Sequence, residues 1–312
     1  MTEFCVSDFL DMVYEDITGK FVSPLEFAGD QWEAYKAGRK KEIKCLLRLD
    51  YLEENYQEEL HYSLLESKKP GGESTVVIEK YRVDRIRRLP LCVYMLRPGE
   101  WNGKAILYLN GHDPRGARGA FAEDDTGKET LGMAMASLGY LVLVPELFAF
   151  GEAKRRDASE ETDACTSCSM LESHLLNCGH AFGAYGISGG GHVCNYTGVL
   201  EDRVEAVMLS GYPNLYKYSI LAMDHCICNY VPGQLEAGGS HQVTALAAPK
   251  KLLAMNGRKD PIFPLQGSLE AFQYLDSDYE RLGVPERCTH ILFEGGHEVS
   301  VGDVCRWLKV NY

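Results

Sequence analysis

A serine, an aspartate and a histidine that could act together in catalysis occur in this order along the second half of the chain. Ser188 is the centre of residues 186–190, Gly-Ile-Ser-Gly-Gly, which is the Gly-x-Ser-x-Gly pattern of a serine on a sharp turn between a strand and a helix. On such a turn, a base can reach the hydroxyl from one side and a carbonyl carbon from the other. The pattern is short, so its weight depends on the residues that accompany it.

The acid and the base each follow an apolar segment that is typical of a buried parallel strand. Residues 251–255 are Lys-Leu-Leu-Ala-Met, and the turn after them presents Asp260. Residues 290–293 are His-Ile-Leu-Phe, and two glycines before His297 free the backbone to aim its imidazole over the sheet. Because ligands gather at the carboxyl ends of strands in open α/β sheets, we predict that Ser188 is the nucleophile, Asp260 the acid and His297 the base. The simpler alternatives are that Asp260 caps a helix and that His297 caps or packs.

A tetrahedral intermediate also needs hydrogen-bond donors for its negative charge. Residues 105–109, Ala-Ile-Leu-Tyr-Leu, are typical of a central strand, and Asn-Gly-His-Asp follows them. We predict that the backbone amide of His112 in this segment and that of Gly189 form the oxyanion hole. Each such donor typically contributes about 3–4 kcal/mol to transition-state stabilisation.

Several of these motifs together match one known pattern. The matching segments are residues 109–112, 144–146 with 150–152, 186–191, 256–264 and 293–298. From about Lys104 to its end, the chain resembles the α/β-hydrolase superfamily, specifically its dienelactone-hydrolase-like and acetyl-xylan-esterase-like branch. One departure is the Cys- and Ser-rich segment 160–186, where relatives carry a longer helix and a clearer strand.

The resemblance implies the fold class and the chemistry. The expected fold is an α/β-hydrolase fold, with a mostly parallel doubly wound sheet, antiparallel N-terminal strands and a helical N-terminal extension. The expected activity is hydrolysis of a carboxylic ester with a small or medium acyl group, a carbohydrate acetyl ester being one option. We expect no cofactor and no metal ion. Two alternatives stay open: a prolyl-oligopeptidase-like peptidase or amidase, and a noncatalytic binding protein with this fold.

Composition excludes other classes of partner. The chain has 312 residues, 45% of them hydrophobic and 25% charged, which suits one elaborated domain or two modest ones. With 32 basic and 45 acidic residues the net charge is −13, so we expect no nucleic-acid partner. There is no run of about eighteen apolar residues, and the acidic N-terminal segment is unlike a secretory signal. We therefore predict a cytoplasmic protein without a membrane partner.

The chain is expected to have two parts. Residues 1–70 are predicted to be a helical extension, because residues 24–51 carry apolar side chains at helical intervals. This apolar stripe is expected to pack on the main domain or on a second subunit, which makes a homodimer one option. Residues 71–312 are predicted to be the catalytic domain, opened by antiparallel strands at 75–83 and 89–96. The arginines of the segment between these strands are expected on a solvated sheet edge.

A long aromatic segment at about 211–240 is predicted to be a lid-like insertion or an acyl-pocket wall, because it mixes apolar and phenolic side chains with Pro and Gly. The alternative is a short helical excursion that fills the core. The expected pocket residues are Tyr212, His225, Cys226, Cys228 and Tyr230.

The cysteines are not expected to form a disulfide framework, since there are 11 of them at irregular spacing. Cys165 and Cys168 have the Cys-x-x-Cys spacing of half a zinc site or of a redox pair, but a second half is not evident. Cys226 and Cys228, beside His225, are interpreted as small polarizable side chains of the pocket wall.

Overall fold

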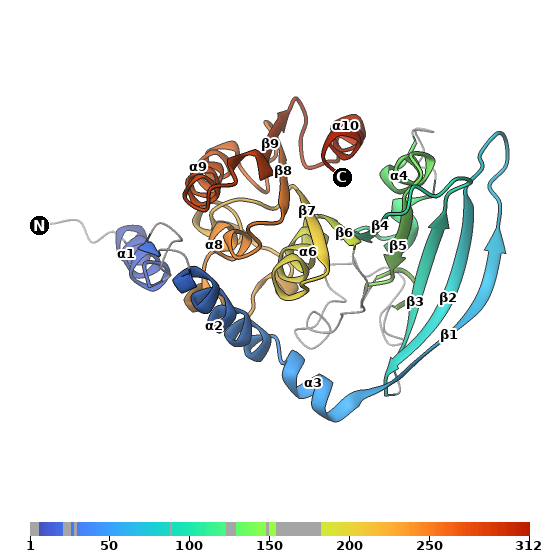
Figure 1. The fold of residues 1–312 in the computed structure, drawn as a ribbon. Helices are drawn as coiled ribbons and strands as arrows, with labels where there is room; N and C mark the ends of the chain where they lie inside the picture. The colour runs from blue at the N-terminus through green and yellow to red at the C-terminus, as the bar shows by residue number, and fades with distance from the viewer. Residues whose placement is uncertain are drawn as a thin grey trace, which may run out of the picture.

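The computed structural model describes residues 6–20, 26–27, 30–87, 89–122, 129–147, 150–153 and 182–312. In these residues nine strands form one mixed sheet in the order β1-β2-β3-β5-β4-β6-β7-β8-β9 (Figure 1). The strands are β1 (Gln57–Lys68), β2 (Val77–Ile86), β3 (Leu89–Arg97), β4 (Ala105–Leu109), β5 (Leu141–Pro145), β6 (Phe182–Ile187), β7 (Val204–Ser210), β8 (Lys251–Gly257) and β9 (Cys288–Phe293).

The pairing divides the sheet into two zones. β1 to β3 pair antiparallel with one another, and β3 pairs antiparallel with β5. The pairs from β5 through β4, β6, β7 and β8 to β9 are all parallel. The predicted fold class, a mostly parallel sheet preceded by antiparallel strands, is confirmed.

Helices cover both faces of the parallel zone, as the crossover connections between parallel strands require. The helices are α1 (Val6–Thr18), α2 (Asp30–Leu46), α3 (Leu49–Tyr56), α4 (Leu131–Ser137), α6 (Gly189–Leu200), α7 (Gln234–Ala237), α8 (Ser240–Ala245), α9 (Leu265–Arg281) and α10 (Val301–Asn311). α6, α8 and α9 pack on one face together with α2, and α4 and α10 pack on the other (Figure 1).

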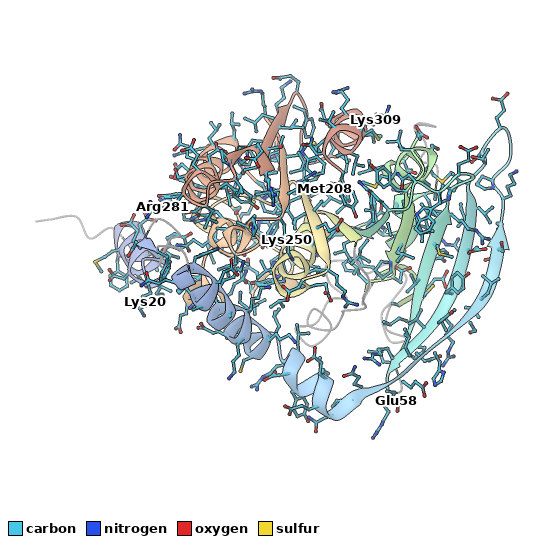
Figure 2. The ribbon with its side chains drawn as sticks, in the orientation of Figure 1. Lys20, Glu58, Met208, Lys250, Arg281 and Lys309 are labelled. Atoms are coloured by element: carbon cyan, nitrogen blue, oxygen red, sulfur yellow. The ribbon has the colours of Figure 1, made fainter. Side chains whose placement is uncertain are left out.

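The central strand β7 shows why its sequence is apolar almost throughout. Val207 and Leu209 face the cluster that contains α6, whereas Ala206 and Met208 face the cluster that contains α10. Successive side chains of a strand point to opposite faces, so a strand buried on both faces needs apolar residues at every position. Met208 accordingly lies at the centre of the molecule, while charged residues such as Lys309 project from its periphery (Figure 2).

Helix α2 packs on the part of the chain that carries the parallel strands. Trp32 and Ile43 of α2 are buried in the same hydrophobic cluster as side chains of α6, α8 and α9. Lys36 donates to the carbonyl oxygen of Ala248 at 3.1 Å, and Arg39 donates to that of Glu236 at 2.9 Å. The apolar stripe therefore packs on the main body of the chain, one of the two placements predicted.

Strand β1 lies at the end of residues 1–70, the predicted helical extension, and the prediction did not include this strand. Leu60, Tyr62 and Leu64 alternate with polar residues, a two-residue period that fits a strand. These three side chains are nevertheless exposed, so pairing with β2 is what holds the segment extended. The arginines of β2 were expected on a sheet edge. They do not lie on an edge strand, because β1 pairs with the outer side of β2. The boundary between two domains near residue 70 stays a prediction.

The segment after β7 contains several short helical turns instead of one long element. These include the 3-10 turns Tyr216–Tyr218 and Ile227–Asn229, followed by α7 and α8.

Much of the Cys- and Ser-rich segment 160–186 lies outside the described residues, as do Cys165 and Cys168. In the part of the chain that the structure describes, no helix combines the length and apolar character needed to cross a bilayer.

We predict that Gly190→Ala destabilises the protein by about 1–3 kcal/mol or more, because a Cβ there would lie 2.2 Å from the carbonyl oxygen of Leu109 and 2.3 Å from that of Asn110. The matched control is Gly38→Ala in α2, where a Cβ meets nothing within 4 Å. This control should stabilise the helix by about 0.5–1 kcal/mol. Urea unfolding of both variants measures the difference. Equal stability of the two variants would contradict the close packing at Gly190.

Candidate active site

Ser188 lies on the sharp turn that its sequence motif predicted. It connects β6 to α6, and its backbone has φ 54° and ψ −122°. A residue with a side chain rarely adopts a positive φ, and such strain persists only where the surrounding structure enforces it. Here the Ser188 amide donates to the carbonyl oxygen of Ser210 at 3.0 Å, which ties the turn to the end of β7.

His297 and Asp260 form the expected pair. His297 Nδ1 and Asp260 Oδ2 are 2.8 Å apart, and the Asp260 side chain is fully buried. The other carboxylate oxygen accepts from the backbone amides of Ile262 at 2.8 Å and Phe263 at 2.9 Å. The Phe263 ring also stacks on the imidazole of His297 with 5.6 Å between centroids. The imidazole is thus fixed in both position and orientation.

The surroundings of Asp260 favour its ionised form. Burial by itself would raise the pKa of this carboxyl, but the hydrogen bonds from His297 and from the amides of Phe263 and Ile262 outweigh it. The pKa of Asp260 consequently lies below its usual value. An ionised carboxylate accepts a hydrogen bond from Nδ1–H, and in that tautomer Nε2 of His297 carries no proton.

The end of β7 brings Ser188 and His297 close to each other. A Cβ on Gly211, the residue after Ser210, would lie 3.0 Å from His297 Cε1 and 3.5 Å from Asp260 Oδ2. Ser188 and His297 also line the same pocket. Among the described residues, the Ser188 hydroxyl has no hydrogen bond to His297. The predicted contact between Ser188 and His297 therefore stays a prediction.

The loop after β4 lies directly beside the serine. A Cβ on Gly111 would lie 3.0 Å from the carbonyl oxygen of Ile187 and 3.2 Å from Ser188 Cβ, so the loop approaches the Ser188 turn closely at this glycine. A Cβ on Gly189 would lie 2.5 Å from His112 Cε1, which places the imidazole of His112 against the start of α6. The two predicted oxyanion donors, His112 and Gly189, are therefore neighbours, and the aim of their amides stays a prediction.

The pocket has a volume of about 1020 Å³, and acidic residues predominate in its charged lining. The described lining contains one arginine, Arg115, which is paired with Asp113 at 2.7 Å. The lining carboxylates are Asp113, Glu129, Asp224 and Glu298. Sequence reasoning did not find these residues, although Asp113 and Glu298 each directly follow a predicted site residue.

Two of the five expected pocket residues lie elsewhere. Tyr212 is completely buried, and its hydroxyl contacts His192 Nδ1 at 3.0 Å and the Tyr216 hydroxyl at 2.8 Å. Tyr230 has a structural contact instead: its hydroxyl accepts from the His225 amide at 3.2 Å and donates to the carbonyl of Ile220 at 3.1 Å. Neither ring lines the large pocket, because Tyr212 fills core space and Tyr230 fastens a loop.

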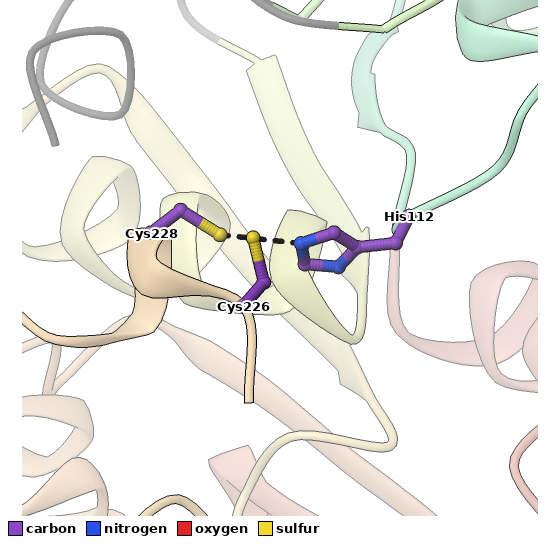
Figure 3. Close-up of side chains that lie close together, drawn as sticks. All are labelled: His112, Cys226 and Cys228. Carbon is purple, nitrogen blue, oxygen red and sulfur yellow. Dashed lines mark hydrogen bonds between the residues drawn. The ribbon is translucent and has the colours of Figure 1, made fainter. Parts of the chain in front are cut away.

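The other three expected pocket residues gather near the serine. His225 and Cys226 line the pocket, together with His112. Burial lowers the pKa of His225 and so favours its neutral form. Cys228 is half-buried behind them, with its Sγ 3.2 Å from His112 Nε2 (Figure 3). This contact joins the segment after β7 to the loop after β4.

A buried glutamate holds two loops near the pocket together. Glu146 follows β5, and its carboxylate accepts from the amides of Ala117 at 2.8 Å and Glu152 at 3.4 Å. Gly116 and Gly151 both have positive φ and leave no room for a Cβ beside this carboxylate. Burial raises the pKa of Glu146 to about 7, because these two amides only partly offset the loss of hydration.

Comparison with known proteins is informative at the level of structure. No family model matches the chain, and no match is found among curated proteins. Methylesterase BT1017 is similar with a TM-score of 0.70 and 20% identity, over 96% of this chain and 68% of that one. A candidate acetyl xylan esterase from Bacteroides fragilis NCTC 9343 has a TM-score of 0.68 and 12% identity, over 93% and 82% of the two chains. Acetyl xylan esterase 1 from Thermoanaerobacterium sp. JW/SL YS485 has a TM-score of 0.51 and 14% identity, over 96% and 98%.

These likenesses establish the fold. At such low identities they do not carry an activity from one protein to another. The chain has the α/β-hydrolase fold, as its sequence motifs predicted, and the three solved structures described above carry names of esterases.

We predict that ionisation of Glu146 destabilises the protein as the pH rises from about 4.5 to about 7. In this window the folded protein holds a proton that the unfolded chain has lost, so the free energy of unfolding falls with pH. A pKa near 7 instead of 4.5 corresponds to about 3 kcal/mol. Glu146→Gln cannot ionise, so its stability relative to wild type should improve by that order between pH 5 and pH 8. Urea unfolding at several pH values measures this difference, and a difference independent of pH would refute the raised pKa.

Proposed function

We propose that this protein is a serine hydrolase that cleaves carboxylic esters through an acyl-enzyme. The observation that carries the proposal is the 2.8 Å contact between His297 and the buried Asp260, at a pocket that Ser188 also lines. The strained turn at Ser188 adds support, because an exposed hydroxyl on such a turn is typical of a nucleophile. The fold shared with a methylesterase and with acetyl xylan esterases supports an ester as the bond cleaved.

The proposed mechanism assigns one role to each residue. Ser188 attacks the acyl carbon while Nε2 of His297 takes the hydroxyl proton. Asp260 holds the imidazole in the required tautomer and stabilises the cation that forms, and its lowered pKa keeps it ionised at neutral pH. The leaving alcohol then receives the proton from His297. A water molecule repeats the sequence, releases the acid and restores the serine.

The developing oxyanion requires its own donors. We assign the backbone amides of Gly189 and His112 to this role, since the loop that carries His112 packs against the first residue of α6. The glycine at position 111 favours this approach, because a Cβ there would lie only 3.2 Å from Ser188 Cβ. The arrangement therefore depends on two glycines at the meeting point of the loop and the helix.

The pocket favours a polar substrate without a net negative charge. Its described lining has four carboxylates and one arginine, so an anionic polysaccharide would be repelled. Its volume of about 1020 Å³ is at the upper end of the range for small-molecule sites, which leaves room for an alcohol part much larger than an acetyl group. A short acyl group on a neutral sugar fits both properties. We propose a carbohydrate acetyl ester as the substrate class.

Ser188→Ala is expected to reduce ester hydrolysis at least about 10³-fold, because it removes the nucleophile. The matched control is Ser277→Ala on the exposed side of α9, which should retain wild-type activity. Hydrolysis of p-nitrophenyl acetate, butyrate and octanoate measures the effect and the acyl-length preference. A fluorophosphonate probe should label the wild type and the control but not Ser188→Ala.

Two outcomes would redirect the assignment. Faster turnover of an aminoacyl-p-nitroanilide than of every ester would indicate a peptidase or amidase. No labelling of the wild type together with no turnover would indicate a noncatalytic protein.

The substrate class is tested by comparing hydrolysis of acetylated xylo-oligosaccharides with hydrolysis of a methyl-esterified polyuronate. We expect activity on the acetylated xylo-oligosaccharides.

Asp260→Asn is expected to lower kcat by about 10³–10⁴-fold with little change in KM, because the amide favours the wrong tautomer of His297. Asp276→Asn is the matched control, since Asp276 contacts His290 at 2.7 Å in a similar pair that does not line the pocket. Steady-state kinetics on p-nitrophenyl acetate compares the two variants. Equal losses in both would remove Asp260 from the mechanism.

A further inference from the structure

A cluster of potential metal ligands lies beside the proposed nucleophile. His112, Cys226 and Cys228 each offer one ligand atom, and these atoms all lie within 4.8 Å of one another (Figure 3). The two cysteines belong to the segment after β7, where Cys228 is in the 3-10 turn Ile227–Asn229, and His112 belongs to the loop after β4. The turn brings the two sulfur atoms to the same side, facing the imidazole (Figure 3).

The spacing is close to that of a zinc site. Tetrahedral zinc, with bonds of about 2.0–2.3 Å, keeps its ligand atoms about 3.3–3.8 Å apart. The cluster already has its atoms within 4.8 Å, with 3.2 Å between His112 Nε2 and Cys228 Sγ. Side-chain adjustments of about 1 Å would complete the geometry.

The donor set selects a particular class of ion. Two thiolates and one imidazole are soft to borderline ligands, which suit Zn²⁺ and exclude Mg²⁺ or Ca²⁺ as preferred partners. We propose that His112, Cys226 and Cys228 bind one Zn²⁺ ion. Three protein ligands leave the fourth tetrahedral position for a water molecule or another donor.

The surroundings are suited to a cation. His112 and Cys226 line the large pocket, so an ion can enter the site from solvent. The carboxylates of Asp224 and Glu298 line the same pocket, and the chain as a whole has a net charge of −13. Both features raise the local concentration of cations. Two thiolates would neutralise the charge of a bound Zn²⁺.

A bound ion would act on the active site through His112. It would join the loop after β4 to the segment after β7, two walls of one pocket. The His112 ring lies against Gly189, so holding this ring also fixes the start of α6 next to Ser188. The site would thus immobilise the loop to which one oxyanion donor is assigned.

Among the described residues, a second group of potential metal ligands, with a different set of residue types, serves as an internal control. Asp276, Cys288 and His290 also have ligand atoms within 4.8 Å of one another. In this group His290 Nε2 is 2.7 Å from Asp276 Oδ1, and the group has a single thiol. It does not line the large pocket.

The test is metal binding by the full-length protein, which is first reduced and stripped of metal. Titration with Co²⁺ should give one bound ion per chain with thiolate-to-cobalt charge-transfer absorption, and Zn²⁺ should displace it. The double variant Cys226→Ser/Cys228→Ser should lose at least about 100-fold in Co²⁺ affinity, because it loses two of three ligands. Cys228→Ser alone should also lose the charge-transfer band of the intact site. Cys288→Ser/His290→Asn should bind like the wild type.

The outcomes separate the proposal from its alternatives. Wild-type binding that persists in the double variant would place the ion elsewhere, for example on the cysteines at 165, 168 and 178, and would overturn the proposal. An absence of cobalt–thiolate absorption in the reduced wild type would also overturn the proposal. This holds even if the two thiols form a disulfide with each other on oxidation. Thermal unfolding of the metal-free variants checks that each one folds. Because the readout is absorption, it does not depend on whether Ser188 is a nucleophile.

Discussion

The left-handed backbone of Ser188 is the constraint around which the site is built. A residue with a side chain in this conformation costs about 1–3 kcal/mol, so neighbouring contacts must hold it there. They do so by close approach: Gly190 packs on the carbonyls that end β4, and the Ser188 amide is bonded to the end of β7. The serine is therefore presented where the carboxyl ends of the central parallel strands meet, which is where the loops carrying Asp260 and His297 also begin.

Two buried carboxylates near this edge show how the same fold produces opposite pKa shifts. Asp260 accepts from two backbone amides and contacts an imidazole, and its pKa is lowered. Glu146 accepts from two amides but, among the described residues, has no imidazole partner of this kind, so burial dominates and its pKa is raised to about 7. The hydrogen-bond donors around each group decide the sign. Asp260 is thereby kept ionised for its contact with His297, whereas Glu146 joins two loops by accepting hydrogen bonds from the amides of Ala117 and Glu152.

The walls of the pocket come from segments with little regular structure. The loop after β4 contributes His112 and Asp113, and the excursion after β7 contributes His225 and Cys226. Such segments are positioned by what they contact, and here the His112–Cys228 contact and the Tyr230 hydroxyl hold them. Tyr230 thus holds the segment after β7 in place without lining the pocket.

The sequence by itself determined the strand–turn–helix at Ser188 and the parallel strands before Asp260 and His297, because these depend on local glycines and on apolar runs that one strand alone specifies. The contact between Asp260 and His297 joins two separate segments, and the sequence indicated it only through the resemblance to a known fold. Only the tertiary structure decided that 57–68 is a strand, since its apolar side chains are exposed and its partner β2 holds it. It also decided that Tyr212 is core, and that His112 meets two cysteines more than a hundred residues away. Contacts between distant segments depend on the folded path of the chain, and no local pattern records them.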